Sequence, residues 1–107
     1  MGKASSREGL ADPAVEHALA FLGERGVLAI IHLLTIGPAG FNEVARHTAL
    51  SPATLAQRLA LLEREGVLAK RTISTMPPRG EYSLTPSGAA LAPVVKAIET
   101  WAHTHNH

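Results

Sequence analysis

Three dipeptides fix where the helices of this chain can begin. In Asp12-Pro13, Ser51-Pro52 and Thr85-Pro86, a residue whose side-chain oxygen can cap backbone N–H groups precedes a proline. The fixed φ of proline suits the first turn of a helix, where its missing N–H removes no helical hydrogen bond. Each dipeptide therefore predicts a helix start, and the three together divide the 107 residues into segments that can be interpreted one at a time.

The segment after Pro13 has the spacing of an amphipathic helix, which Gly23 and Gly26 end. Its apolar residues at i, i+3, i+4 and i+7 are Val15, Ala18, Leu19 and Leu22. Ala14 and Phe21 widen this apolar face. Because the face is broad for so short a helix, we expect it to contact a second partner besides the core of its own chain.

The apolar stretch from Val27 to Ile36 predicts a central helix, which Gly37-Pro38 ends. His32 interrupts this stretch and is expected to be a core or interface histidine. The stretch is much shorter than the roughly 20 residues that span a bilayer. The polar first residues also lack the apolar segment of a signal peptide. We therefore expect a cytoplasmic protein with no membrane partner.

From Phe41 to Gly66 the pattern predicts a helix-turn-helix. Its first helix is expected to end near His47 or Thr48, and a tight connection leads to the cap at Ser51. Gly66 is a typical left-handed stop for the second helix. The buried side of that second helix is predicted to consist of Leu55, Leu59 and Leu62.

Residues 67–84 predict a β-hairpin, because β-branched and alternating apolar residues flank a proline-rich turn. Residues 76–80, Met-Pro-Pro-Arg-Gly, are expected to form its tip and to interrupt the strand ladder. The segment 86–103 then predicts one C-terminal helix. Its apolar stripe contains Leu91, Val94, Val95, Ile98 and Trp101.

This order of elements is typical of a winged helix-turn-helix with flanking helices. The predicted fold class is therefore mainly α with a small β-hairpin, in which the N- and C-terminal helices serve dimerisation. The expected organisation is a flexible N-terminal segment at 1–11, a domain at 12–103 (helix-turn-helix 41–66, wing 67–84, C-terminal dimer helix 86–103) and a His-rich tail at 104–107.

The positive charge of the chain is concentrated in its middle. The whole chain has a formal net charge of +1, which by itself indicates no nucleic-acid partner. Between Phe41 and Gly80, six basic residues stand against three acidic ones, a net charge of +3, whereas the remainder has four basic and six acidic residues, a net charge of −2. The helix-turn-helix and the wing are thus the basic part, as expected for DNA binding.

The helix after Ser51 fits a recognition helix, whose first residues reach base edges in the major groove. Gln57 and Thr54 are the candidate base readers, because Gln can pair with adenine and the Thr methyl can contact the thymine methyl. Ser51, at the helix cap, and Arg58 are expected to contact phosphates. The candidate DNA-binding residues are Asn42, Ser51, Ala53, Thr54, Gln57, Arg58, Arg64, Arg71 and Arg79.

On an isolated helix, Thr54, Gln57 and Arg58 would more simply form a solvated face, because short motifs are weak signals. Here the helix follows a short turn and precedes a hairpin that carries Lys70, Arg71 and Arg79. This context favours double-stranded DNA as the partner.

The order of these motifs resembles the HxlR family of winged-helix transcription regulators over about residues 12–103. The matching segments are Gly37-Pro38, Phe41-Asn42-Glu43-Val44, Leu50-Ser51-Pro52, Leu55, Gln57-Arg58-Leu59, Leu62-Glu63-Arg64-Glu65-Gly66-Val67-Leu68, Pro77-Pro78-Arg79, Glu81-Tyr82-Ser83-Leu84-Thr85, Gly88 and Trp101. The resemblance implies a homodimer that places one recognition helix in each half-site of a pseudo-palindromic operator. It implies dimer contacts from the first and last helices, at Ala14, Val15, Phe21, Val94, Ile98 and Trp101.

Three departures from the family bear on function. Many members carry a cysteine just before the first proline and sense electrophiles or oxidants with it, whereas this chain has Asp12 there and no cysteine. Thiol sensing is therefore not expected. Arg25-Gly26 stand where the family commonly has Gly-Lys-Trp. Ala53 and Ala60 replace basic residues that are frequent on the recognition helix, which predicts weaker and less salt-dependent binding.

Two other functions stay open. A winged-helix module that binds protein instead of DNA would also explain Ala53, Ala60 and the low net charge. A repressor with a pocket at the dimer interface would respond to a small-molecule effector or a metal. His103, His105 and His107 could bind a transition metal, but a polar tail is the simpler interpretation, so no metal or cofactor is expected. The chain has no catalytic motif that we recognise, so we expect it not to be an enzyme.

Overall fold

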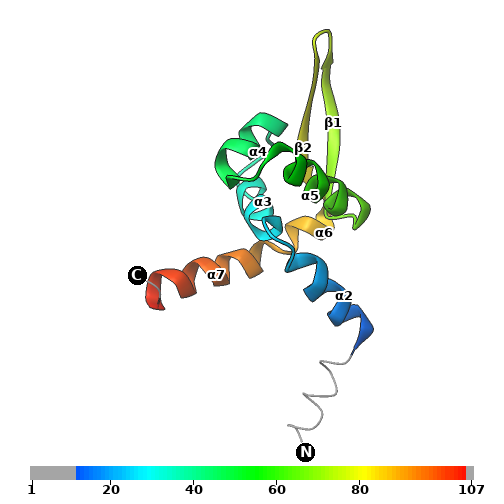
Figure 1. Cartoon of the computed structure of the whole chain (residues 1–107). Helices are drawn as coiled ribbons and strands as arrows, with labels where there is room; N and C mark the ends of the chain where they lie inside the picture. The colour runs from blue at the N-terminus through cyan, green and yellow to red at the C-terminus, as the bar shows by residue number, and fades with distance from the viewer. Residues whose placement is uncertain (1–11, 106–107) are drawn as a thin grey trace, which may run out of the picture.

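The computed structural model describes residues 12–105, and its elements follow the predicted order (Figure 1). They are α2 (Pro13–Leu22), α3 (Val27–Leu34), α4 (Phe41–Thr48), α5 (Pro52–Arg64), β1 (Leu68–Thr75), β2 (Pro78–Leu84), α6 (Pro86–Ala89) and α7 (Ala92–His105). The fold is mainly helical with one two-stranded antiparallel hairpin, which confirms the predicted fold class. The predicted flexible segment 1–11 and the last two residues of the predicted tail lie outside the described residues.

All three predicted helix starts are confirmed by their caps. The Ala14 amide donates to Asp12 Oδ1 over 2.8 Å at the start of α2. The Thr54 amide donates to Ser51 Oγ over 3.2 Å at the start of α5. The Gly88 amide donates to the Thr85 hydroxyl over 3.1 Å at the start of α6.

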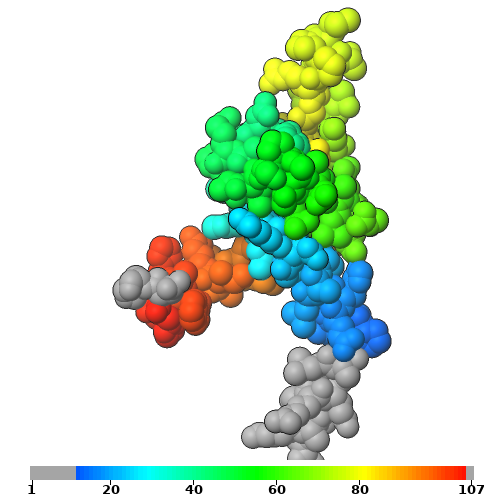
Figure 2. Space-filling view, viewed as in Figure 1, coloured from blue at the N-terminus to red at the C-terminus, as the bar shows by residue number. Residues whose placement is uncertain are grey.

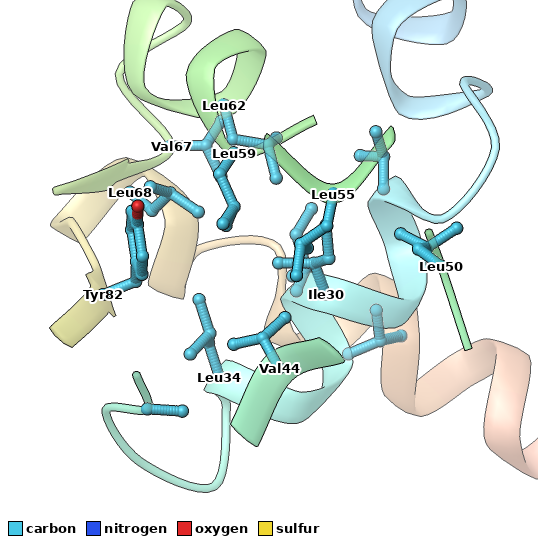
Figure 3. Close-up of a cluster of buried hydrophobic side chains, with 14 residues drawn as sticks. Ile30, Leu34, Val44, Leu50, Leu55, Leu59, Leu62, Val67, Leu68 and Tyr82 are labelled. Atoms are coloured by element: carbon cyan, nitrogen blue, oxygen red, sulfur yellow. The ribbon is translucent and has the colours of Figure 1, made fainter. Parts of the chain in front are cut away.

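The hydrophobic core surrounds α3, whose Val27, Ile30 and Ile31 are fully buried. Figure 3 shows Ile30 of α3, Val44 of α4 and Leu55 of α5 pointing toward one another. The predicted buried side of α5 is confirmed for Leu55, Leu59 and Leu62. Complete burial of each such side chain contributes about 1.5–3 kcal/mol. His32 does not belong to this core, because it is exposed on α3.

The hairpin pairs β1 with β2 from Leu68 opposite Leu84 to Thr75 opposite Pro78, with an irregularity between Thr72 and Ser74. Its base is fixed by Ala39, whose amide and carbonyl form hydrogen bonds with Tyr82 of 3.0 and 2.8 Å. The long tip of the hairpin projects away from the helices (Figure 1).

The expectation that residues 76–80 leave the ladder was wrong. Pro78, Arg79 and Gly80 all have partners on β1, so only Met76 and Pro77 form the connection. Pro78 is tolerated because it is the first residue of β2, where a missing N–H removes no interior ladder bond.

The expectation of one helix over 86–103 was also wrong. The chain forms a short α6, breaks at Ala90 and Leu91, and begins again as α7. The cause is Pro93, which has no N–H to donate to the Ala89 carbonyl and whose ring would collide with that carbonyl in a continuous helix. Helix α7 also continues to His105, so part of the predicted tail is helical.

Helices α2 and α7 extend from the body of the molecule in different directions (Figure 1). The apolar face predicted for α2 is not buried within the chain, since the helix contains no buried residue. Leu19 is 62% exposed. On α7, Val95 is the one buried residue, and Trp101 is 58% exposed. Both helices therefore leave apolar side chains uncovered in a single copy of the chain.

Candidate nucleic-acid interface

A tight turn joins α4 to α5 and sets the angle between them. Ala49 adopts a left-handed conformation (φ 56°) and ends α4, and Ser51 then caps α5. Leu50, between them, is buried. It lies against Gly26 of the α2–α3 turn, where a β-carbon would come within 2.5 Å of Leu50 Cδ1. The helix-turn-helix therefore rests directly on the α2–α3 turn.

The side of α5 opposite its buried leucines faces solvent. Ala53, Gln57, Ala60 and Arg64 are all exposed along this side. Figure 2 shows α5, in green, at the front of the molecule, with α4 beside it and the hairpin above. Gln57 is thus on an open surface where its amide could meet a base edge.

Thr54 and Ser51, predicted as a base reader and a phosphate contact, are already joined in the helix cap. The Ser51 hydroxyl donates to Thr54 Oγ1 over 3.1 Å and also accepts the Thr54 amide. Thr54 is half-buried, unlike its neighbour Ala53. Its methyl group is therefore less available to a base than the Gln57 side chain is.

Arg58 is held against the α2–α3 turn. Its Nε donates to the Arg25 carbonyl over 2.8 Å, and its Nη2 lies 3.6 Å from Glu24 Oε1. Only 19% of the side chain is exposed. The guanidinium predicted to contact a phosphate therefore also supports the fold, by fastening the middle of α5 to the preceding helices.

The predicted cations of the wing differ in their surroundings. Arg71 and Glu81 are directly opposite in the hairpin, and Arg71 Nη2 donates to Glu81 Oε1 over 3.0 Å. Lys70 Nζ lies 5.8 Å from the centre of the Tyr82 ring. Arg79 is exposed near the tip. Lys70 and Arg79 also line an open hollow of about 400 Å³ on one face of the hairpin.

The remaining predicted DNA contacts lie at the ends of the two helices. Asn42 is exposed in the first turn of α4, and Arg64 is exposed in the last turn of α5. The candidate set thus spreads from α4 across α5 to the hairpin. It does not converge on one enclosed site.

Arg25 was missed by the sequence analysis, which assigned it to the acidic remainder of the chain. In the structure it lines a hollow of about 460 Å³ together with Ser51, Thr54 and Arg58. The departure at Arg25-Gly26 was visible in the sequence, but the contact between Gly26 and Leu50 that brings the two segments together was not.

The predicted dimer residues are mostly exposed. Ala14 and Val15 are exposed on α2, and Val94, Ile98 and Trp101 are exposed on α7. Phe21 differs, because it is half-buried and its ring centre lies 5.5 Å from that of His17. Leu19 was not among the predicted contacts, although it is the most exposed large apolar residue of α2.

A hollow of about 380 Å³ lies between α3 and α7. Leu28, Val95 and Ile98 supply apolar lining, and His32 and His103 are also among its residues. Its mouth is open in a single copy of the chain, and Ile98 belongs both to the hollow and to the predicted dimer contacts.

The described residues contain neither a cluster of metal ligands nor a single helix that could span a membrane. Within 12–105, no group of three or more His, Cys, Asp or Glu residues could hold a metal ion. In the same range, no single helix is long and apolar enough to cross a membrane. Helices α2 and α3 reach that length and composition only as a pair, and they are bent by 83°.

Comparisons with known proteins agree with this architecture. The sequence model described as HxlR-like helix-turn-helix matches residues 21–107. The HTH-type transcriptional regulator YvaP of Bacillus subtilis is 42% identical over 91 residues, which cover 84% of each chain. The reduced form of the transcriptional regulator YodB from B. subtilis superposes with a TM-score of 0.75 at 32% identity, covering 89% of this chain and 94% of that one.

The redox regulator HypR in its oxidized form superposes with a TM-score of 0.81 at 27% identity, covering 88% of this chain and 98% of that one. The family-model match thus includes the helix-turn-helix, the hairpin and α7, and it begins at the end of α2.

Proposed function

Because the chain belongs to the HxlR-like helix-turn-helix family of transcriptional regulators, we propose that it binds double-stranded DNA as a homodimer. Each copy places α5 in the major groove of one half-site of a pseudo-palindromic operator. The family consists of transcriptional regulators and not of enzymes.

The observation that carries this proposal is the exposed side of α5. Its polar residues, Gln57 and Arg64, face solvent on a helix that is anchored from behind by three buried leucines. Ala53 and Ala60 on the same side of α5 are small and uncharged, so they let the helix approach the groove closely. Gln57 then carries most of the base reading, because its amide can form two hydrogen bonds with adenine.

The wing supplies contacts that do not depend on sequence. Arg79 near the hairpin tip and Lys70 are exposed and bear positive charge. They contact the phosphate backbone or the minor groove beside the major groove that α5 occupies. Such contacts position the protein on the duplex but do not distinguish bases.

Dimerisation covers the apolar residues of α2 and α7. Leu19 and Trp101 are each more than half exposed in one copy. Large apolar side chains exposed on the surface of a single copy are typical of interaction surfaces. To engage two half-sites in successive major grooves, a symmetric dimer through these helices has to hold its two α5 helices about 34–36 Å apart, one turn of B-DNA.

Any sensing by this regulator proceeds without a thiol, because the chain has no cysteine. Asp12 stands in the position that precedes the first proline, and its carboxylate caps α2 through the Ala14 amide. The position is thus occupied by a helix cap that cannot be oxidised in the way a cysteine can.

A small-molecule effector is a second candidate function, favoured by the hollow between α3 and α7. Its lining is mainly apolar and it borders the proposed dimer contacts at Ile98. A ligand that fills it would change how α7 packs on α3. Thermal unfolding across a ligand panel and across zinc, nickel and copper tests this function, and no shift in any sample would count against it.

Fluorescence anisotropy tests DNA binding. The protein is titrated against a labelled duplex from the region upstream of its own gene and against a scrambled duplex, at several salt concentrations. We expect saturable binding that is tighter for the natural duplex. Absence of saturable binding at low salt contradicts the proposal. A protein partner retained at high salt, with no DNA footprint, would then support an interaction module.

A further inference from the structure

Arg25 lies beside the start of the recognition helix, although 26 residues, which include α3 and α4, separate it from Pro52 in the sequence. The hollow that it lines is bounded by the α4–α5 turn, at Ala49 and Leu50, and by the first turns of α5, at Ser51 and Thr54. Figure 2 shows the α2–α3 turn, in blue to cyan, on the same face of the molecule as α5.

The charge of this hollow is positive. Arg25 and Arg58 contribute two guanidinium groups, and Glu24, which lies 3.6 Å from Arg58, contributes one carboxylate. Among residues 12–105, no carboxylate forms an ion pair with the Arg25 side chain. The Arg25 guanidinium is exposed and keeps its hydrogen-bond donors for an external acceptor.

Arg58 fixes the backbone that carries Arg25. Its Nε donates to the Arg25 carbonyl, so the α2–α3 turn is held at the middle of α5. Gly26, in the same turn as Arg25, packs on the Leu50 side chain, and a β-carbon at Gly26 would come within 2.5 Å of Leu50 Cδ1. Two contacts therefore hold the backbone of Arg25 next to the recognition helix, while its side chain stays exposed.

We propose that Arg25 binds a backbone phosphate of the DNA at the edge of the major groove that α5 enters. The proposal rests on the proposed DNA binding and adds a contact from outside the helix-turn-helix. Arginine suits this role because its guanidinium can donate two parallel hydrogen bonds to phosphate oxygens. The contact fixes the depth and direction of α5 in the groove, since phosphate contacts set register and orientation.

This contact also compensates for the small number of phosphate-binding side chains on α5 itself. Ala53 and Ala60 cannot contact phosphates, and Arg58 is partly used within the fold. Arg25 restores a phosphate contact at the side of α5 that faces the α2–α3 turn. The basic surface is therefore larger than the segment from Phe41 to Gly80 that the sequence marks as basic.

The test compares Arg25→Gln, Arg25→Lys and a control, Lys96→Gln, in anisotropy titrations at several salt concentrations. Arg25→Gln removes the charge but keeps the main-chain carbonyl that accepts from Arg58. Lys96 is an exposed cation on α7, paired only with Glu99 at 3.6 Å among the described residues. Circular dichroism and sedimentation verify that each variant is folded and has the oligomeric state of the parent.

Each phosphate contact contributes about 0.9 to the slope of log K against log salt concentration. We expect Arg25→Gln to lower the magnitude of that slope by about 1.8 for a dimer with two contacts. Affinity should fall by the same factor on natural and scrambled duplexes. Arg25→Lys should keep most of the slope, and Lys96→Gln should leave it unchanged.

The outcomes separate the two proposals. If the parent binds no duplex, the proposed DNA binding fails. If the parent binds and Arg25→Gln has the same slope as Lys96→Gln, DNA binding stands and the phosphate contact of Arg25 is wrong. A loss that is confined to the natural duplex would also overturn it, because that result would make Arg25 a base reader.

Discussion

His17 Nε2 lies 2.8 Å from Glu65 Oε1, so the first described helix contacts the residue that ends the recognition helix. Together with Arg58, which donates to the Arg25 carbonyl, this contact fastens α5 to α2 and its following turn at two points. If α2 forms part of the dimer interface, these two polar contacts link the position of each α5 to the geometry of the dimer.

Glu65→Gln tests this link, with Glu63→Gln as its control. Both substitutions remove one carboxylate near the end of α5, but only Glu65 contacts His17. The free energy of unfolding, measured with urea, should change by less than about 1 kcal/mol, because the His17–Glu65 pair is partly exposed. Operator affinity should fall by up to about fivefold, the equivalent of that energy, and only for Glu65→Gln. Equal operator affinity for the two variants would contradict the link.

Gln57→Ala and Arg79→Ala should weaken DNA binding in different ways. Loss of the Gln57 amide should relax discrimination at particular base pairs by about 1–3 kcal/mol. Loss of the Arg79 charge should weaken all duplexes alike and lower the salt dependence. The measurement is competition with operator variants that carry single base changes. If Gln57→Ala lowers only non-specific affinity, Gln57 does not read bases.

The helix starts could be predicted from the sequence because each depends on neighbouring residues. Asp12, Ser51 and Thr85 accept amide hydrogens from two or three residues further along the chain. The buried side of α5 could equally be predicted from the sequence, since Leu55, Leu59 and Leu62 follow the helical period. The break before α7 could also have been read from Pro93, but the apolar stripe on both sides of it concealed the interruption.

Features that depend on distant segments could not be read from the pattern. Arg25 reaches the recognition helix through the packing of Gly26 on Leu50, two residues that are far apart in the sequence. The partial use of Arg58 within the fold likewise depends on the path of the α2–α3 turn. The distribution of charge along the sequence therefore indicated the basic wing, but it did not indicate that Arg25 lies beside α5.

Gly88→Ala should destabilise the fold. A β-carbon at Gly88 would collide with the carbonyl oxygen of Val67, where α6 passes close to the start of the hairpin. The obstacle is backbone, which cannot move aside as a side chain can, so we expect a loss of about 1–3 kcal/mol. Gly37→Ala is the matched control, because nothing lies within 4 Å of its β-carbon. Urea unfolding of both variants measures the difference, and equal midpoints would disprove the close contact.

Ile98→Asp should convert the proposed dimer to a monomer. Ile98 is nearly half exposed on α7 in one copy, so an aspartate is tolerated there in the isolated chain. In a dimer the same carboxylate would be buried against apolar residues without a partner, which is strongly unfavourable. Thr100→Asp adds the same charge to an exposed residue of α7 outside the apolar stripe and serves as the control. Sedimentation equilibrium should give a monomer for Ile98→Asp and a dimer for Thr100→Asp. Operator affinity should fall for Ile98→Asp alone, since one copy contacts only one half-site, and a dimer that survives Ile98→Asp would place the interface elsewhere.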